Sequence, residues 1–378
     1  MKIPFNKPYA TGAELAYLAE AIAGEHLSGD GSFSKRCQHR LGEIFGPTKA
    51  MLTHSCTAAL EMAAILCDLG ADDEVVMPAF TFPSTANAVV LRGAIPVFVD
   101  IRSDTFNLDE GLIEAAITPR TKAIFAVHYA GVGCEMDAIT NIARRHNLRV
   151  VEDAAQGILS RYNGRFLGTL GDIGALSFHE TKNVISGEGG AILINNHEYY
   201  ERAEIVREKG TNRTSFFRGD IDKYTWVDIG SSYLPSEIVA AFLLAQLEQM
   251  WELTRRRKEI WSCYHRAFEE LEAAGLLRRP VVPASCDHNG HLYYLDMPDA
   301  AARSRLIAGL KDRGIYAPFH YVPLHTSPAG LRFGRANGRL PITERAGECL
   351  VRLPIWIGIE PHLDRIIGEI SSIVNQNR

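Results

Sequence analysis

A single lysine, Lys182, lies between a strand-like apolar segment and a cluster of glycines. It follows GALSFH, which is typical of a buried strand, and precedes the Gly187–Gly190 turn signal GEGG and a second strand-like segment, AILIN. A lysine amine held at a strand end can form a Schiff base with a carbonyl compound. The position therefore predicts either covalent catalysis or an incidental loop residue.

Two other strand-like segments end in residues that can bind a ligand. LRVVEDAAQG places Asp153 directly after an apolar strand, with Gln156 three residues later. THSCTAAL places Ser55, Cys56 and Thr57 before an apolar helix. Both patterns are also typical of helix N-caps, and for Asp153 alone the cap is the favoured interpretation. The free N–H groups and hydroxyls at the start of the second helix equally suit a phosphate.

Together these residues match the needs of pyridoxal 5'-phosphate (PLP). This cofactor requires a lysine amine for a Schiff base and a carboxylate that keeps its pyridine nitrogen protonated, so that the ring can withdraw electrons. It also requires an anion site and a flat group against the ring face. The candidates are Lys182 for the amine, Asp153 for the carboxylate, Thr57, Ala58 and Ser177 for the phosphate, and Phe82 in MPAFTFPSTANA for the ring. A lysine buried beside this cofactor is expected to lose its proton easily.

The chain alternates strand-like and helix-like segments from residue 49 to about residue 195. The predicted strands are KAMLT, EVVMP, IPVFVD, KAIFAVH, LRVVED, IGALSFH and GAILIN, and helical patterns cover residues 57–69, 83–92, 109–117 and 135–147. This alternation implies crossover connections and a mainly parallel, seven-stranded sheet in an α/β fold. Ligands of such sheets bind at the carboxyl ends of the strands.

The C-terminal part of the chain has a different pattern. Pro235 is predicted in the first turn of a long helix that reaches about residue 273, with room for a break. Beyond it, HLYYLDM and YAPFHYV are the strand-like segments, accompanied by two helical ones. We therefore expect a large PLP-binding domain over residues 1–245 and a smaller α+β domain over residues 246–378. No flexible linker separates them, so the two domains should pack firmly.

The composition excludes several classes of protein. With 378 residues and a net charge of -5, the chain has no basic field for nucleic acid or an anionic membrane. The one basic run, Arg255–Lys258, is expected to form a solvated helix face. The longest clearly apolar run, Ile238–Ala245, is too short to cross a bilayer, and no signal peptide is expected. Seven scattered cysteines without a CxxC pair indicate reduced thiols in a cytoplasmic protein, without a disulfide or metal site.

Several motifs resemble one enzyme family. ED-A-A-Q, SFH-x-x-K-N and S-G-E-G-G occur in this order, together with HLSGDG, VHYAG and FHYVPLH. The set resembles the sugar-nucleotide aminotransferases of the DegT/DnrJ/EryC1/StrS family over essentially the whole chain. The resemblance implies a PLP-dependent transferase of fold type I, similar to aspartate aminotransferase. It further implies L-glutamate as amino donor, a nucleotide-linked keto sugar as acceptor, and a homodimer with shared active sites.

The resemblance also assigns roles to the candidate residues. It makes Lys182 the Schiff-base lysine and the proton carrier, and it pairs Asp153 with the pyridine nitrogen. Gln156 would contact the ring hydroxyl, and Phe82 would stack on the ring. The remaining cofactor residues, for the phosphate, would be Thr57, Ala58 and Ser177, with Cys56 beside Thr57 where the family usually has glycine.

Two departures from the family pattern concern the segment G-x-N-x-R-M, which reads GSSYLP at residues 230–235. Ser232 stands at the position of the asparagine that the partner subunit supplies to the phosphate, and its hydroxyl can still donate. Leu234 stands at the arginine position and cannot bind a carboxylate. The group that holds the glutamate carboxylate is therefore open, with Arg213, Arg218 and Lys223 as candidates.

The sugar nucleotide is expected to bind partly on residues of the neighbouring subunit. KGTNRTSFFRGDIDKYTWVDIGSSYL, HETKN and LSGDGSFSKRCQ resemble a subgroup of the family that aminates C4 of TDP-4-keto-6-deoxyglucose. The candidate substrate residues are His320, Tyr321 and His325, with Asn212, Arg213, Arg218, Lys223 and Tyr224 from the neighbour.

Three alternatives remain open at this level. The first is an aminotransferase of the family that acts at C3 or on another nucleotide sugar. The second is a dehydratase of the same fold, in which related enzymes replace the lysine with histidine; the presence of Lys182 disfavours it. The third is a PLP-binding sensor without catalysis, which no additional DNA-binding module supports. The stereochemistry of the new amine is not predicted by any residue.

Overall fold

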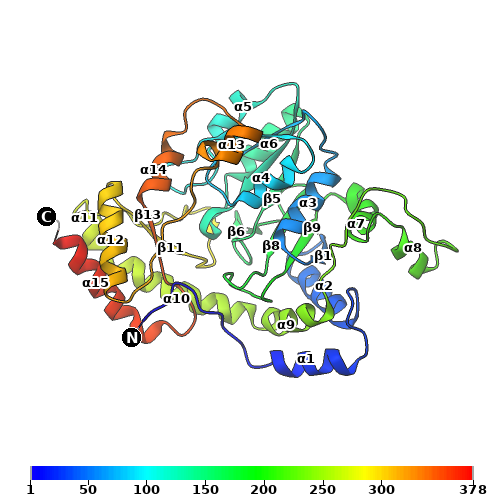
Figure 1. The fold of residues 1–378 in the computed structure, drawn as a ribbon, viewed down its shortest axis with the longest axis horizontal. Helices are drawn as coiled ribbons and strands as arrows, with labels where there is room; N and C mark the ends of the chain where they lie inside the picture. The colour runs from blue at the N-terminus through cyan, green and yellow to red at the C-terminus, as the bar shows by residue number, and fades with distance from the viewer. Residues whose placement is uncertain (1, 377–378) are drawn as a thin grey trace.

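A computed structural model describes residues 2–376 of the chain (Figure 1). Its main sheet has eight strands in the order β1-β9-β8-β5-β4-β2-β3-β12. β9 is antiparallel to both of its neighbours, and the other pairs are parallel. The strands are β1 Lys49–Thr53, β2 Glu74–Pro78, β3 Ile95–Val99, β4 Thr121–Val127, β5 Arg149–Asp153, β8 Ile173–Ser177, β9 Gly190–Ile194 and β12 Arg335–Ala336.

The predicted α/β fold of the fold type I class is confirmed, and all seven predicted strands are present. The sheet has one strand more than predicted, because Arg335 and Ala336 from the C-terminal part pair with β3. Two residues carry no periodicity that a sequence pattern could reveal.

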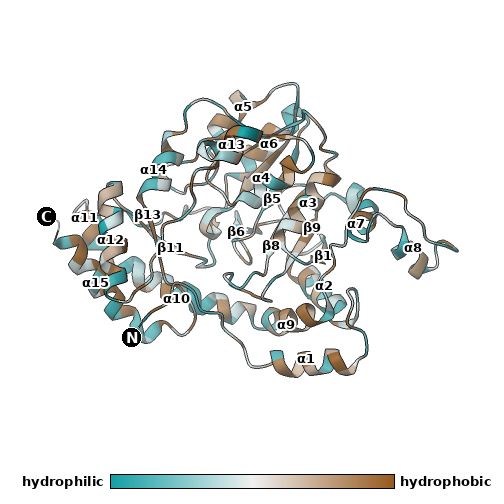
Figure 2. Ribbon diagram, in the orientation of Figure 1, coloured by the Kyte–Doolittle hydropathy of each residue, from teal (hydrophilic) through white to brown (hydrophobic). Residues whose placement is uncertain are grey.

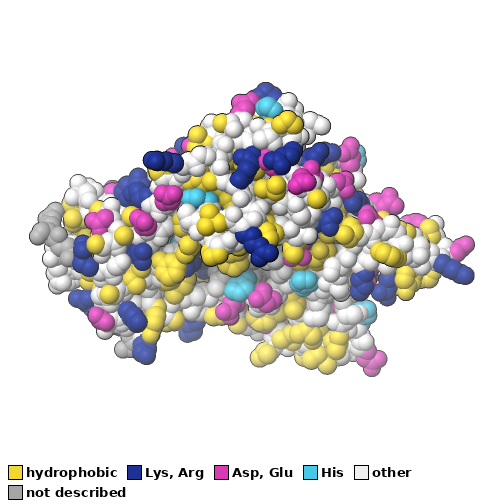
Figure 3. Space-filling view, turned by 45° about the horizontal axis from the view of Figure 1, so that its top comes forward, with side chains coloured by type: hydrophobic (Ala, Val, Ile, Leu, Met, Phe, Trp, Pro, Cys, Tyr) yellow, Lys and Arg dark blue, Asp and Glu magenta, His cyan; other side chains and the backbone are white. Residues whose placement is uncertain are grey.

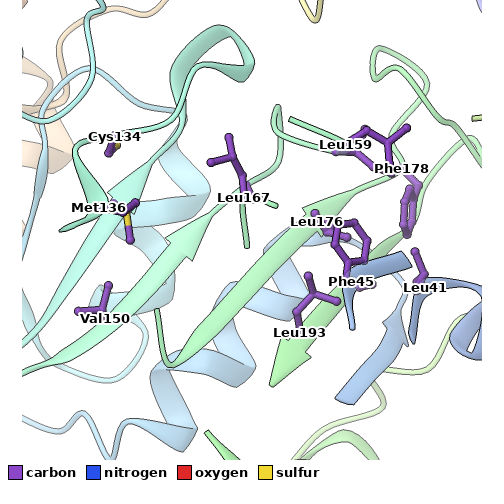
Figure 4. Packing of buried hydrophobic residues seen from close by; sticks show 14 of the residues in the cluster. Leu41, Phe45, Cys134, Met136, Val150, Leu159, Leu167, Leu176, Phe178 and Leu193 are labelled. Atoms are coloured by element: carbon purple, nitrogen blue, oxygen red, sulfur yellow. The ribbon is translucent and has the colours of Figure 1, made fainter. Parts of the chain in front are cut away.

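Helices cover both faces of this sheet, and the two faces form separate hydrophobic cores. Val76 of β2 lies in one core and its neighbours Val75 and Met77 lie in the other, as expected for alternating side chains. The first core is shared with α1 Glu14–Ala23, α2 Ser32–Phe45, α6 Met136–His146 and α9 Glu237–Glu248. The second is shared with α3 Cys56–Leu66, α4 Pro83–Val90 and α7 Tyr200–Arg207. Figure 4 shows Phe45 of α2 beside Leu176 and Leu193 in the first core, and Figure 2 shows α3 as predominantly hydrophobic.

A third core lies in the C-terminal part, near both chain ends (Figure 1). It includes Ile3, whose backbone bonds to Gly314 and Tyr316. The division at residues 245 and 246 stays a prediction. The elements of this part are α10 Met250–Ala267, α11 Glu269–Ala273, β10 Cys286–Asp287, β11 Tyr293–Asp296, α12 Ala300–Asp312, α13 Pro328–Phe333, α14 Pro341–Cys349, β13 Leu350–Leu353 and α15 Leu363–Asn375.

The remaining elements are short. They are α5 Ile113–Ala116, β6 Arg161–Tyr162, β7 Arg165–Phe166, α8 Arg213–Arg218 and five 3-10 turns at Glu110–Leu112, Tyr129–Gly131, His197–Tyr199, Leu324–Thr326 and Glu360–His362. None of the described helices is long and apolar enough to cross a membrane. On the face shown in Figure 3, lysine and arginine side chains are interspersed with acidic ones, in keeping with the net charge of -5.

Three local predictions were wrong. Within the described residues, four helices, α12 to α15, follow residue 278, where two helical segments were predicted. Pro235 does not lie in the first turn of a helix, because α9 begins at Glu237 with Ser236 as its N-cap. YAPFHYV forms no strand. Pro318 in the middle of this segment lacks the N–H group that a sheet ladder needs, which explains the irregular backbone. The long helix does have the expected break, at Gln249 between α9 and α10.

Candidate active site

The candidate cofactor residues surround one cavity of about 550 Å³ at the carboxyl ends of β5 and β8. Its walls come from both the large sheet and the C-terminal part of the chain. The sequence-predicted residues that line it are Cys56, Thr57, Phe82, Asp153, Gln156, Ser177, Lys182, His320 and Tyr321. Ala58 is buried one residue further along α3.

Lys182 is half-buried in the turn after β8, and its N–H donates to the carbonyl of His179 at 2.9 Å. Among the described residues, its ammonium group has no hydrogen-bond acceptor. Burial lowers the pKa of Lys182, and the positive charge of Arg352 lowers it further, against the opposing effect of Asp153. A lowered pKa increases the fraction of neutral amine, which is the form that attacks a carbonyl group.

The glycine turn after Lys182 brings the chain back against the start of α3. Gly187 has a φ of +80°, which favours glycine. A Cβ atom on Gly190 would lie 2.4 Å from the carbonyl carbon of Ser55 and 2.5 Å from the nitrogen of Cys56. The first residue of β9 must therefore be glycine for the strand to pass this close to the helix start.

Replacing Gly190 with alanine is expected to destabilise the protein by about 1–3 kcal/mol, because two backbone segments must separate. The same shift displaces the start of α3 and should weaken PLP binding. Thermal denaturation and a PLP titration followed by absorbance measure the two effects. Gly368→Ala, in α15 where no atom lies within 4 Å of the added carbon, is the matched control. Equal melting temperatures for the two variants would contradict the close approach.

Asp153, at the end of β5, is a buried carboxylate that lines the cavity. It accepts hydrogen bonds from the Thr85 hydroxyl at 2.7 Å and from the Ala155 N–H at 3.1 Å. No helix begins after Asp153, so the N-cap interpretation of this residue is wrong. The carboxylate is held by the protein and faces a cavity, which suits a protonated ring nitrogen of a ligand.

The neighbouring carboxylate, Glu152, has a structural role instead. This buried carboxylate lies 2.8 Å from the His128 ring nitrogen Nε2 and accepts three backbone N–H groups, from Gly168, Leu170 and Gly171. Because side chains alternate along a strand, Glu152 and Asp153 point to opposite faces of the sheet. Only Asp153 reaches the cavity.

The start of α3 suits an anion. The first N–H groups of a helix have no intrahelical acceptor and favour negative charge. The Ser55 hydroxyl caps the helix by accepting a hydrogen bond from the Ala58 N–H at 3.0 Å. The Ala58 N–H, a predicted donor to the phosphate, is therefore bound to Ser55. The Thr57 hydroxyl lies 2.7 Å from that of Ser84, a cavity residue that the sequence analysis missed. Burial raises the pKa of the Cys56 thiol well above its ordinary value, so this residue is neutral.

An aromatic wall bounds another side of the cavity. The Gln156 amide donates to the Tyr321 hydroxyl at 2.7 Å and accepts from the Ala130 N–H at 2.7 Å. The rings of Tyr321 and His320 stack with centroids 3.8 Å apart, and His320 Nδ1 lies 2.7 Å from the Tyr129 hydroxyl. Burial lowers the pKa of His320 well below its ordinary value, so its ring is neutral.

Phe82, the predicted stacking residue, lines the cavity and is 58% exposed. It precedes α4 and lies 6.4 Å from the Tyr321 ring, centroid to centroid. An aromatic face that is open to a cavity can cover a flat ligand.

Several predicted residues do not line the cavity of this chain. His325 is outside it, with Nε2 3.2 Å from Glu344. Ser232 is exposed on a short bridge to Glu208. Figure 1 shows α8 and the loop after it projecting from the body. This segment and the residue before it, Asn212, carry the candidates whose predicted roles belong to a neighbouring subunit, which are Asn212, Arg213, Arg218, Lys223 and Tyr224.

One prediction about the basic run was wrong, because Arg257 is buried. Its guanidinium lines the cavity and donates to the carbonyl groups of Gly290 and His291. Burial lowers the pKa of Arg257 to about 10. The other members of the run form ion pairs at the surface, Arg256 with Glu360 for example.

Arg352 is a second cavity cation that the sequence analysis missed. It interrupts the apolar segment CLVRLPIW, and a charged residue inside such a segment was the available signal. His291, which also lines the cavity, was missed without a comparable signal.

A lysine after a strand, a buried carboxylate and a helix start around one cavity fit a PLP-dependent enzyme of the fold type I class. Residues 8–371 match the profile of the DegT/DnrJ/EryC1/StrS aminotransferase family, and the chain belongs to this family. It is therefore a PLP-dependent sugar aminotransferase.

Relatives of known structure or function agree with this assignment. The GDP-perosamine synthase of Caulobacter vibrioides is 32% identical, over 99% of this chain and 98% of that protein. The aminotransferase TlmJ from Streptoalloteichus hindustanus is 31% identical with a TM-score of 0.91, covering 100% of both chains. The PLP form of Spr1654, a candidate sugar aminotransferase from Streptococcus pneumoniae, is 27% identical with a TM-score of 0.90, over 100% of this chain and 99% of that one.

Proposed function

We propose that this enzyme transfers the amino group of L-glutamate to C4 of TDP-4-keto-6-deoxy-D-glucose. The products are TDP-4-amino-4,6-dideoxy-D-galactose and 2-oxoglutarate. The observation that carries the proposal is Lys182, a lysine of lowered pKa placed in the same cavity as the buried Asp153. Residues 209–234, HETKN and LSGDGSFSKRCQ resemble the TDP-4-keto-6-deoxyglucose 4-aminotransferase of enterobacterial common antigen synthesis, which supports the choice of sugar.

The residues of the cavity divide the chemistry between them. PLP, when bound, supplies a carbonyl group for amine exchange and a ring that withdraws electrons. Asp153 holds a proton on the ring nitrogen. The neutral amine of Lys182 removes the α-proton of the donor and later returns a proton to C4 of the sugar, as one positioned base used twice. The start of α3 anchors the phosphate, and Phe82 with the Tyr321 wall keeps the ring in place.

A homodimer with shared active sites is part of this proposal. The projecting segment after α7 exposes Phe217 and Trp226, at 69% and 78%. The same segment carries the polar candidates for the sugar nucleotide, and Ser232 follows it in the chain. If a second subunit packs against these aromatic side chains, the polar residues of the projecting segment would lie close to an active-site cavity of the dimer. Size-exclusion chromatography with light scattering measures the oligomeric state.

A GDP-linked sugar is the second candidate, because the Caulobacter relative is a GDP-perosamine synthase. A dehydratase is disfavoured by the presence of Lys182 in the cavity. A PLP-binding sensor would keep this lysine but would not exchange its cofactor amine with glutamate.

Assaying a panel of keto sugars distinguishes these possibilities. We expect the highest kcat/KM for TDP-4-keto-6-deoxyglucose, with lower values for GDP-linked 4-keto sugars and for C3-keto sugars. NMR of the product determines whether the new amine is axial, as in the galactose configuration. A preference for the GDP-linked sugar, or an equatorial amine, would refute the proposed substrate and product.

A further inference from the structure

Arg352 of β13 presents a guanidinium to the cavity without an acidic partner. Its Nε and Nη2 atoms donate to the carbonyl oxygen of Phe319 at 3.1 and 2.9 Å. Within residues 2–376, Nη1 has no hydrogen-bond acceptor, and no carboxylate forms an ion pair with this arginine. The ring of Phe5 lies on one side, with its centroid 4.7 Å from the guanidinium carbon. One edge of the guanidinium is therefore fixed by the protein, and donors remain for a ligand.

Two arginines, Arg257 and Arg352, line the cavity together with the carboxylates of Asp153 and Glu188. Within residues 2–376 neither guanidinium forms an ion pair with a carboxylate, because both donate to backbone carbonyl groups. His291 and His320 add no charge, because burial lowers the pKa of both well below the ordinary value. A guanidinium removed from water without a counter-ion is costly. A site of this kind is stabilised when its ligand is an anion.

Arg352 lies apart from the phosphate anchor in the fold. The phosphate donors belong to the start of α3 and the end of β8, whereas Arg352 comes from the C-terminal part, beside Phe319 and Phe5. Lys182 and Arg352 line the same cavity, but Arg352 comes from a different part of the fold than the phosphate donors.

We propose that Arg352 binds a carboxylate of the amino donor and so positions its α-carbon beside Lys182. The planar guanidinium matches a carboxylate through two parallel hydrogen bonds. This inference rests on the proposed function, in which the donor is glutamate. It also supplies a group for the glutamate carboxylate, which Leu234 cannot bind at the position where the family has arginine. Arg213 and Arg218 lie outside the cavity of this chain and form ion pairs with Glu208 and Glu204.

The diphosphate of the sugar nucleotide is the other anion that an arginine could bind, and the experiment separates the two. Glutarate, a dicarboxylate without an amino group, binds without reacting, and calorimetry of the PLP-loaded enzyme measures its affinity. We expect Arg352→Gln to weaken glutarate binding and raise the KM for glutamate by about 10- to 100-fold. The KM for the keto sugar should stay within about 3-fold.

Two further variants control for charge and folding. Arg313→Gln removes an arginine from the same part of the chain, where it pairs with Glu369 outside the cavity, and should leave glutarate binding unchanged. Arg352→Lys keeps the charge but loses the two-pronged geometry, so a loss of about 10-fold is expected. If Arg352→Gln does not fold, the glutarate affinity of Arg352→Lys is compared with that of the wild type instead.

Unchanged glutarate affinity in a folded Arg352 variant would overturn the proposal. A raised KM for the keto sugar with normal glutarate binding would also overturn it and assign Arg352 to the diphosphate. A wild type that neither binds glutarate nor reacts with glutamate would refute the donor and this role together. If the enzyme does not accept the proposed sugar, glutarate binding can still be measured, so the two proposals can fail separately.

Discussion

Lys182→Ala lowers kcat for amino transfer by roughly 10⁴-fold or more, because one side chain provides both the covalent link to PLP and the proton transfer. The start of α3 and Asp153 remain, so the variant should still bind the cofactor without a covalent bond. Formation of 2-oxoglutarate in a coupled assay measures the loss. Lys182→Arg should be equally inactive, since a guanidinium stays protonated and cannot attack a carbonyl group.

The exposed Lys122 offers the matched control, and Lys122→Ala should keep full activity. Loss of activity with loss of PLP binding and folding would indicate a structural role for Lys182, which circular dichroism would detect. Turnover by Lys182→Ala at the wild-type rate would remove the basis of the proposed chemistry.

Asp153→Asn is expected to lower the rate of the glutamate half-reaction by about 10²- to 10³-fold, the usual cost of removing one fixed electrostatic group. Without the carboxylate, the ring nitrogen loses its proton and the ring withdraws electrons poorly. Rapid-mixing absorbance of the PLP-loaded variant with L-glutamate measures this rate. Thr85→Val removes the 2.7 Å hydrogen bond to Asp153 but keeps its charge, so its effect should be smaller, about 10-fold.

Asp364→Asn removes an exposed carboxylate at the start of α15 and serves as the control. A half-reaction in Asp153→Asn within about 3-fold of the wild type would show that the carboxylate does not hold the ring proton. The residue would then be a structural partner of Thr85.

The sequence predicted the sheet well, because its strands are apolar runs between clear helical patterns. Lys182 and Asp153 were recognised because polar groups at strand ends of an α/β sheet gather at one edge. β12 was not predicted, since a strand of two residues is too short to show an alternating sequence pattern. The segment at Tyr316–Val322 was apolar enough to suggest a strand, and only Pro318 argued against it.

Contacts between distant parts of the chain were beyond the sequence pattern. Thr85 lies 68 residues from Asp153, and Tyr129 lies 191 residues from His320. Arg257 was expected on a solvated face, because a run of four basic residues does not reveal which one turns inward. Its burial depends on where α10 passes the cavity, which is a property of tertiary packing.

The absorbance spectrum of the purified protein with PLP, recorded before and after L-glutamate is added, tests the central claim most directly. We predict a visible band from the cofactor bonded to Lys182, its loss on addition of glutamate, and stoichiometric release of 2-oxoglutarate. A visible band that glutamate leaves unchanged, with no 2-oxoglutarate released, would contradict glutamate-dependent amino transfer while leaving the PLP site in place.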